Sequence, residues 1–212
     1  MRPKLSFLVV TSKSSEELAR TLTSLEPLNR DTNLTWELVL IDGFLKENGD
    51  TVRNCGIQDQ VQHLPISVNN PFPAWNLGIE QARGDYVAFW RAGDALSDPS
   101  GLILAINEID LAPEIDILFS SSSTALGVRP KKIPLQKNLL RGTLGVHRIL
   151  LPSCIYRRQK ILKLIPFSLE FALVGDYEFH LRAWIARLTT MPSAGEFLRT
   201  ARVQTLYSRQ AF

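Results

Sequence analysis

The sequence predicts a single α/β domain with a mixed, mostly parallel central sheet flanked by helices. Three observations lead to this fold class. A chain of 212 residues, 45% of them hydrophobic, can bury one substantial core. Apolar runs of strand length alternate with amphipathic segments of helix length, as in parallel sheets with crossover helices. Several runs end in small polar turns that carry a carboxylate, and open α/β sheets bind ligands at such strand ends.

The first two strands are expected to form one βαβ unit. Leu5–Val10 is a continuous apolar run, and Trp36–Ile41 is a second one. Two parallel strands joined by a right-handed crossover present their carboxyl ends at the same edge of the sheet. We therefore expect Thr11 and Asp42, which follow these strands, to lie side by side.

Turn residues and apolar spacing divide the chain into further elements. Ser14 and Glu17 have the spacing of a capping box, which predicts a helix start between the first two strands. The strand Tyr86–Arg91 follows a glycine stop and leads into a turn that carries Asp94. The other expected elements are a weak strand (61–68), a helix (73–83), a helix from 98, a strand (116–119), an irregular region (120–150), a strand (153–156), a short helix (157–164) and a helix from 175.

Composition and motifs exclude several classes of protein. No run approaches the ~18 apolar residues of a membrane span, and no signal-peptide pattern appears. Cys55 and Cys154 are far apart, which favours a reduced cytoplasmic protein over a disulfide scaffold. The scattered histidines and cysteines lack the spacing of a metal cluster. The phosphate-binding loop of P-loop hydrolases, the dinucleotide-binding glycine motif and the hydrolase nucleophile elbow are also absent from the sequence.

The net charge of +3 hides an uneven distribution of charge. Between Asp116 and Glu170 there is no acidic residue but ten basic ones, so the rest of the chain carries −7. Such a segment suits an anionic partner, such as phosphate groups or an acidic membrane, although a solvated surface explains each residue taken singly. Nucleic acid is not expected, because no recognition motif accompanies the charge. The ten residues are Arg129, Lys131, Lys132, Lys137, Arg141, Arg148, Arg157, Arg158, Lys160 and Lys163.

Four carboxylates stand at strand ends or helix starts: Asp42, Asp94, Asp176 and Glu178. Such a group can accept hydrogen bonds from a base or ribose, hold a divalent cation that bridges phosphates, or take a proton from an attacking hydroxyl. Simpler explanations exist as well. Asp42 before Gly43 is also a common turn residue without any ligand. Asp176 would stabilise the amino terminus of its helix by about 0.3–1 kcal/mol through the helix dipole. For Trp75 and Trp90 we expect positions in the core.

In their order and spacing, these segments resemble the inverting glycosyltransferases of family 2, which have the GT-A fold. The similarity covers most of residues 5–98 and 150–185, and each segment is weak on its own. It includes the first strand with Thr11, the Asp-Gly pair after the second strand, and the loop in which the family binds its metal. The segments are 5–11, 39–43, 74–79 with 82–86, 89–94, 155–158 and 175–182.

The resemblance implies one Rossmann-like glycosyltransferase domain over residues 1–212, with a nucleotide-sugar-binding half (1–98) and an acceptor-binding half (99–212). A sugar would pass with inversion from a nucleotide-diphosphate sugar to the hydroxyl of a saccharide or lipid-linked acceptor. This implies a bacterial enzyme of cell-surface polysaccharide or glycolipid synthesis. The enzyme would be cytoplasmic, with peripheral contact to the acidic inner face of the membrane.

The resemblance also implies roles for individual residues. Asp94 would hold a divalent cation, Mn²⁺ or Mg²⁺, on the donor diphosphate. Asp176 would be the catalytic base that deprotonates the acceptor hydroxyl. The other donor-binding positions implied are Thr11, Asp42, Asn76 and Arg83, with Asp42 at the nucleoside.

The sequence departs from the family pattern in four places. Pro73 and Leu77 replace a usual polar pair around the Trp-Asn helix. Ser12-Lys13 replaces a common Tyr-Asn pair, and an unusual run, 44–48, follows the Asp-Gly pair. Arg91 takes the place of a small polar residue, so that Asp94 is the only carboxylate of its loop. Two other functions therefore stay open. A nucleotidyltransferase on a similar scaffold would release pyrophosphate, and a non-catalytic relative would bind nucleotide-sugar without turnover.

Overall fold

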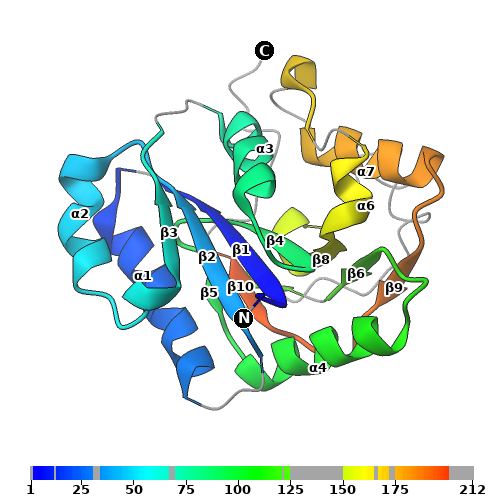
Figure 1. Cartoon of the computed structure of the whole chain (residues 1–212), viewed down its shortest axis with the longest axis horizontal. Coiled ribbons are helices and arrows are strands. Elements are labelled where there is room, and N and C mark those ends of the chain that lie inside the picture. Colours follow the sequence, from blue (N-terminus) through cyan, green and yellow to red (C-terminus); the bar gives the residue numbers. More distant parts are fainter. Residues whose placement is uncertain are drawn as a thin grey trace.

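The computed structural model contains a central sheet, a small second sheet and helices on both faces of the central one (Figure 1). It describes residues 2–11, 13–30, 34–66, 70–120, 122–124, 150–164, 167–171 and 175–200. The central strands are β1 Leu5–Val10, β2 Trp36–Ile41, β3 Val61–Leu64, β4 Tyr86–Arg91, β6 Ile117–Phe119, β8 Cys154–Arg157 and β9 Thr190–Pro192. The second sheet contains β5 Ala95–Leu96, β7 Ser122–Thr124 and β10 Leu198–Thr200. The helices are α1 Ser15–Leu25, α2 Leu45–Arg53, α3 Pro71–Gln81, α4 Pro99–Leu111, α6 Arg158–Leu162 and α7 Gly175–Ile185.

The central sheet is mixed and mostly parallel, as predicted. Its strand order is β3-β2-β1-β4-β8-β6-β9. β1 pairs in parallel with β2 and β4, and β2 does so with β3. β8 is antiparallel to both of its neighbours, β4 and β6. The carboxyl ends of β1, β2, β3 and β4 therefore meet at one edge of the sheet, which we call the carboxyl edge. The opposite edge, where these strands begin, is the amino edge.

Alternating side chains of the strands build two separate hydrophobic cores. Phe7 and Trp90 belong to the core that α1 and α4 cover. Leu8 and Phe89 belong to the opposite core, which α3, α6 and α7 cover. Figure 1 shows this second group of helices gathered on one side of the sheet. Strands buried on both faces explain why the sequence shows continuous apolar runs rather than alternation.

Trp75 of α3 fixes this helix to the centre of the sheet. Its buried indole N–H donates to the carbonyls of Leu8 in β1 and Trp90 in β4, both at 3.2 Å. The ring also packs against Phe72 and Phe89. Trp75 and Trp90 are 1% and 0% exposed, which confirms that both are core residues.

Two glycines let the second sheet approach α4 closely. A Cβ at Gly101 would lie 2.3 Å from the carbonyl oxygen of Glu196, and a Cβ at Gly195 would lie 2.1 Å from that of Gly101. Since real Cβ atoms never come so close to a carbonyl oxygen, any side chain here would push α4 away from the segment that leads into β10.

Most of the predicted elements are confirmed, with shifts at their ends. Ser14 caps α1 by accepting the N–H of Glu17, as the capping-box spacing indicated. α3 begins two residues early, because Asn70 caps it, and β3 ends before the predicted strand does. α2, β5, β9 and β10 were not predicted, and β7 lies in the region 120–150 that was expected to be irregular, most of which falls outside the described residues. Among the described helices, none combines the length and apolar character that a membrane span requires.

The glycine contact predicts opposite effects for two helical Gly→Ala substitutions. Gly101→Ala should lower the free energy of unfolding by about 1–3 kcal/mol, because the new methyl group overpacks a backbone contact. Gly49→Ala in α2 should raise it by about 0.5–1 kcal/mol, since its Cβ would meet only the Arg53 side chain, at 3.5 Å. Urea unfolding of the parent and both variants measures this difference. Equal stabilisation by the two substitutions would show that α4 and the Glu196 backbone are not in contact.

Candidate functional site

Thr11 and Asp42 lie side by side at the carboxyl edge, as the βαβ unit predicted. The Thr11 hydroxyl donates to Oδ1 of Asp42 at 2.6 Å. The same oxygen accepts the backbone N–H of Phe44 at 2.9 Å and the side-chain amide of Asn48 at 3.0 Å. His63 of β3 lies beside the other oxygen, with Nε2 3.3 Å from Oδ2. Three donors thus converge on one carboxylate oxygen.

These contacts keep Asp42 ionised although it is fully buried. Burial by itself raises the pKa of the carboxyl group, but the hydrogen bonds from Thr11, Asn48 and Phe44, with the charge of His63, outweigh it. The pKa therefore lies below its ordinary value. Because Asp42 is 0% exposed, it orders the ends of β1, β2 and β3, and its contact with a nucleoside stays a prediction.

Asp94 lies in a rigid turn directly after β4. Its N–H donates to the carbonyl of Arg91 at 3.0 Å, and Gly93 between them has a φ of 99°, the left-handed conformation that glycine adopts readily. The Asp94 Oδ2 accepts the Arg91 N–H at 2.9 Å. The buried Thr21 hydroxyl of α1 donates to the Asp94 carbonyl at 2.7 Å and accepts the Gly93 N–H at 2.9 Å. The turn is therefore fixed by hydrogen bonds within itself and by Thr21 of α1.

Arg91 lies at the carboxyl edge beside these candidates, although the sequence did not single it out as one of them. Val87, Phe89 and Arg91 alternate along β4 toward the side of α3, and Arg91 is partly exposed at the carboxyl end. Its guanidinium carbon lies 5.3 Å from the centre of the Trp75 ring. The sequence signal for this position is the period of two along the strand, which puts Arg91 on the same face as Val87 and Phe89.

Asp176 lies in the first turn of α7, on the same side of the sheet as Arg91. Gly175 allows this placement, since a Cβ there would lie 2.7 Å from the Phe72 ring of α3. Asp176 is 7% exposed, so it is more secluded than its position after a glycine suggested. Its Oδ1 accepts the N–H of Tyr177 at 2.9 Å.

A buried pair of polar side chains lies next to the first turn of α7. The Tyr156 hydroxyl of β8 and Nε2 of His180 are 2.7 Å apart, and both residues are buried. Burial lowers the pKa of His180 to about 4, against the opposing effect of Asp176, so that the imidazole is neutral at neutral pH. Burial raises the pKa of Tyr156.

Glu178 is engaged away from Asp176. It forms an ion pair with Arg182 one turn further along α7, and the Oε2–Nη2 distance is 2.9 Å. Arg182 in turn donates to the main chain at Leu164. Residues two apart on a helix do not face each other, so Asp176 and Glu178 serve different faces of α7.

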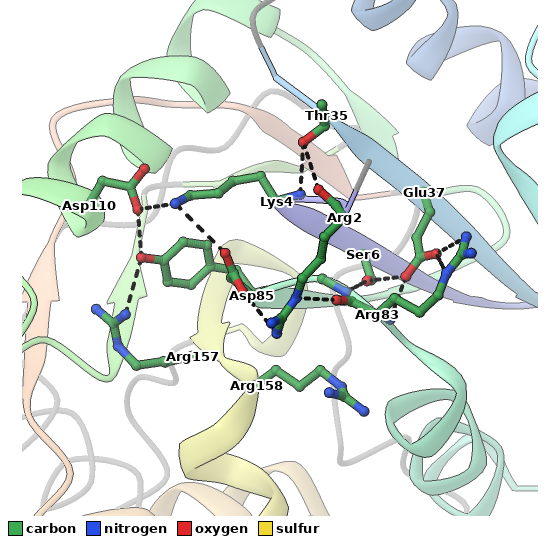
Figure 2. A network of polar contacts seen from close by, with 12 residues as sticks. Arg2, Lys4, Ser6, Thr35, Glu37, Arg83, Asp85, Asp110, Arg157 and Arg158 are labelled. Carbon is green, nitrogen blue, oxygen red and sulfur yellow. Dashed lines mark hydrogen bonds and ion pairs between the residues drawn. The ribbon is translucent and has the colours of Figure 1, made fainter.

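Two predicted donor-binding residues are engaged elsewhere. Both polar atoms of the Asn76 amide bind the main chain of Phe167, at 2.9 and 3.1 Å. Arg83 precedes β4, so it lies at the amino edge, opposite Asp42 and Asp94. Figure 2 shows its guanidinium on Glu37, with Nη2 2.7 Å from Oε2. The structure thus does not bring Arg83 to the other candidates, and we leave it out of the proposed donor site.

The described arginines of the basic segment also lie at the amino edge (Figure 2). Arg157 donates to the carbonyl of Ile115 and lies over the Tyr86 ring, while Arg158 donates to the carbonyl of Ile79. Both guanidinium groups therefore bind main-chain carbonyls of the protein itself. Six of the predicted basic residues fall outside the described ranges, namely Arg129, Lys131, Lys132, Lys137, Arg141 and Arg148.

The turn after β4 fits a divalent cation poorly. Such a cation prefers several oxygen ligands, and Asp94 supplies a single carboxylate, which already accepts the Arg91 N–H. The turn also begins with a cation, Arg91, whose guanidinium lies over Trp75. Within the described residues, no three His, Cys, Asp or Glu side chains are grouped to hold a metal ion. The metal role of Asp94 stays a prediction that this donor set does not support.

The Thr11–Asp42 contact predicts a pH-dependent change in stability. Because the folded-state pKa of Asp42 is lowered, its contribution to stability is present above the ordinary value of 3.8 and is lost as the pH falls through the lowered value. Thr11→Val should therefore cost about 1.5–3 kcal/mol near pH 6, and this cost should shrink below pH ~4. Unfolding measured from pH 3 to 7 tests this. The exposed Thr23→Val is the control, expected within about 0.5 kcal/mol of the parent at each pH. A cost that does not change with pH would contradict the account of Asp42.

Comparison with known proteins supports the fold class. No family model and no curated protein matches the sequence. Three solved structures of S. aureus TarS residues 1–349 are similar to this chain at 18–21% sequence identity. In the first, 93% of this chain matches 60% of TarS 1–349 with a TM-score of 0.69. In the complex with UDP-GlcNAc, 99% of this chain matches 61% of that chain with a TM-score of 0.73, and in the complex with UDP, 94% matches 60% with a TM-score of 0.69. The chain thus spans about three fifths of the length of these proteins and shares their fold, in agreement with the predicted α/β class.

Proposed function

We propose that this protein is an inverting glycosyltransferase of the family 2 type, which moves a sugar from a nucleotide-diphosphate sugar to a hydroxyl acceptor. One observation carries the proposal. The turn with Arg91 and Asp94 at the carboxyl edge and the carboxylate of Asp176 at the start of α7 are connected through contacting rings. Arg91 lies over Trp75, Trp75 packs on Phe72, and Phe72 lies against Gly175.

This arrangement suits a donor that lies across the carboxyl edge with its diphosphate at the turn after β4. Ligands of α/β sheets bind at such an edge. The similarity to a TarS structure with bound UDP-GlcNAc over 99% of this chain agrees with a nucleotide-sugar donor. Asp42 and Thr11 would order the nucleoside end of the site, and Asn76 would support it through Phe167.

The reaction would be a single displacement at the anomeric carbon of the sugar. The acceptor oxygen forms the new bond on one face while the bond to the diphosphate oxygen breaks on the other, and its electron pair leaves with the nucleoside diphosphate. Asp176 accepts the proton of the acceptor hydroxyl and later releases it to solvent.

The acceptor would be a saccharide or a lipid-linked molecule bound by the second half of the chain, residues 99–212. The basic segment supports an anionic acceptor or peripheral contact with an acidic membrane. Its charge also agrees with a cytoplasmic protein of cell-surface polysaccharide or glycolipid synthesis. Because the chain spans only part of the TarS length, acceptor identity belongs to this proposal and not to the comparison.

Substitution of Asp176 tests the proposed base. Asp176→Asn should lower the rate at which nucleoside diphosphate is released from a nucleotide-sugar by roughly a hundredfold or more, with donor affinity unchanged. Glu178→Gln is the matched control and should keep the rate within a few-fold, because Glu178 is paired with Arg182. UDP-GlcNAc is the first donor to assay, followed by other nucleotide-sugars, with water or added saccharides as acceptor.

The products separate this proposal from its rivals. Release of pyrophosphate instead of nucleoside diphosphate would establish a nucleotidyltransferase. Binding of nucleotide-sugars without any turnover would establish a non-catalytic relative. A parental rate in Asp176→Asn together with a large loss in Glu178→Gln would transfer the base to Glu178.

A further inference from the structure

Arg91 has a fixed position at the edge where the proposed donor binds. It is the last residue of β4 and its neighbour in β1 is Val10, so its side chain leaves the sheet at the carboxyl edge. The indole beneath it cannot rotate freely, because its N–H binds the carbonyls of Leu8 and Trp90. A guanidinium over an indole face gains a cation–π contact, and Arg91 remains partly exposed at this edge.

The backbone around Arg91 is fixed as well. Its own N–H donates to Asp94, and its carbonyl accepts the N–H of Asp94 across the turn. Thr21 ties the same turn to α1. The cation is therefore presented from a strand end whose geometry is set by three elements, β4, α1 and α3.

A diphosphate needs positive charge at this place, since a new negative charge develops on it when the bond to the sugar breaks. A guanidinium supplies this charge and binds two phosphate oxygens at once through parallel N–H groups. A divalent cation bound at this turn would have a single carboxylate ligand, that of Asp94. The donor set of the turn thus favours the guanidinium over the metal.

We propose that Arg91, and not a divalent cation, binds the diphosphate of the nucleotide-sugar, so that donor binding is independent of metal. This inference rests on the proposed function, because it assumes a nucleoside diphosphate at the carboxyl edge. Asp94 then acts as a positioning residue, which orients Arg91 through the turn. The sugar transfer itself proceeds as described above, with the leaving diphosphate stabilised by Arg91.

Calorimetry of nucleoside diphosphate binding tests this proposal without an assay of turnover. UDP, GDP, CDP, ADP and TDP are titrated into the parent protein, once with EDTA and once with MnCl₂. The affinity of the preferred nucleotide should agree within about twofold between the two buffers. Arg91→Gln should weaken it by roughly 10- to 100-fold in both, the loss expected for charge-assisted hydrogen bonds. Arg91→Lys keeps the charge but not the paired N–H groups, so its affinity should fall between those of the parent and Arg91→Gln.

Arg20→Gln is the matched control, because Arg20 is an exposed arginine of α1 that pairs only weakly with Glu16, at 3.4 Å. It should bind like the parent. Arg91→Met keeps the packing of the stem on Trp75 and should bind as weakly as Arg91→Gln. Thermal unfolding of each variant shows whether it is folded, and the comparison of buffers on the parent needs no variant at all.

The outcomes distinguish this inference from the proposed function. Affinity that requires MnCl₂ and disappears in EDTA would overturn the role of Arg91 and leave the glycosyltransferase proposal intact. Parental affinity in Arg91→Gln and Arg91→Met would have the same meaning. A parent protein that binds none of the five nucleotides in either buffer would overturn both proposals.

Discussion

The contact on which the rest of the structure depends is the indole of Trp75 in the seam between β1 and β4. One buried N–H is shared between two carbonyls of neighbouring strands, which anchors α3 at the centre of the sheet. Phe72, Phe89 and Phe167 pack around the same ring. Burial of these aromatic surfaces stabilises the core, and the two hydrogen bonds determine where α3 lies along it. The start of α7 and the end of β4 are both placed relative to this ring.

The two edges of the sheet have different chemical roles. At the amino edge, Arg83 is paired with the buried Glu37, and Arg157 and Arg158 bind main-chain carbonyls, so arginines there join elements of the fold to one another. At the carboxyl edge, the Asp42 carboxylate has its donors from within the protein, while Arg91 is partly exposed. Arg83, Arg157 and Arg158, which stabilise the fold, are thus separated from Arg91 by the length of the strands.

The sequence predicted what depends on local pattern and strand order. Apolar runs located the main strands, and the βαβ rule placed Thr11 beside Asp42. The role of Arg83 came from the resemblance to a family, although its place before β4 already put it at the opposite edge. The hydrogen bonds of Asn76 depend on a segment 91 residues away, which no local pattern indicates. The short strands β9 and β10 were missed because their existence depends on partners distant in the chain.

The central position of β1 also has a consequence for the order of folding. β1 precedes both of its partners in the chain, which begin at Trp36 and Tyr86. A mostly apolar strand is therefore synthesised with both of its edges unpaired, and the second edge is covered only after β4 has been made. Such distant pairings require long loops to close before any contact is gained, which slows folding. Until then an unpaired strand edge that favours aggregation stays exposed. During synthesis, β1 thus needs shielding from other chains until β4 has been made.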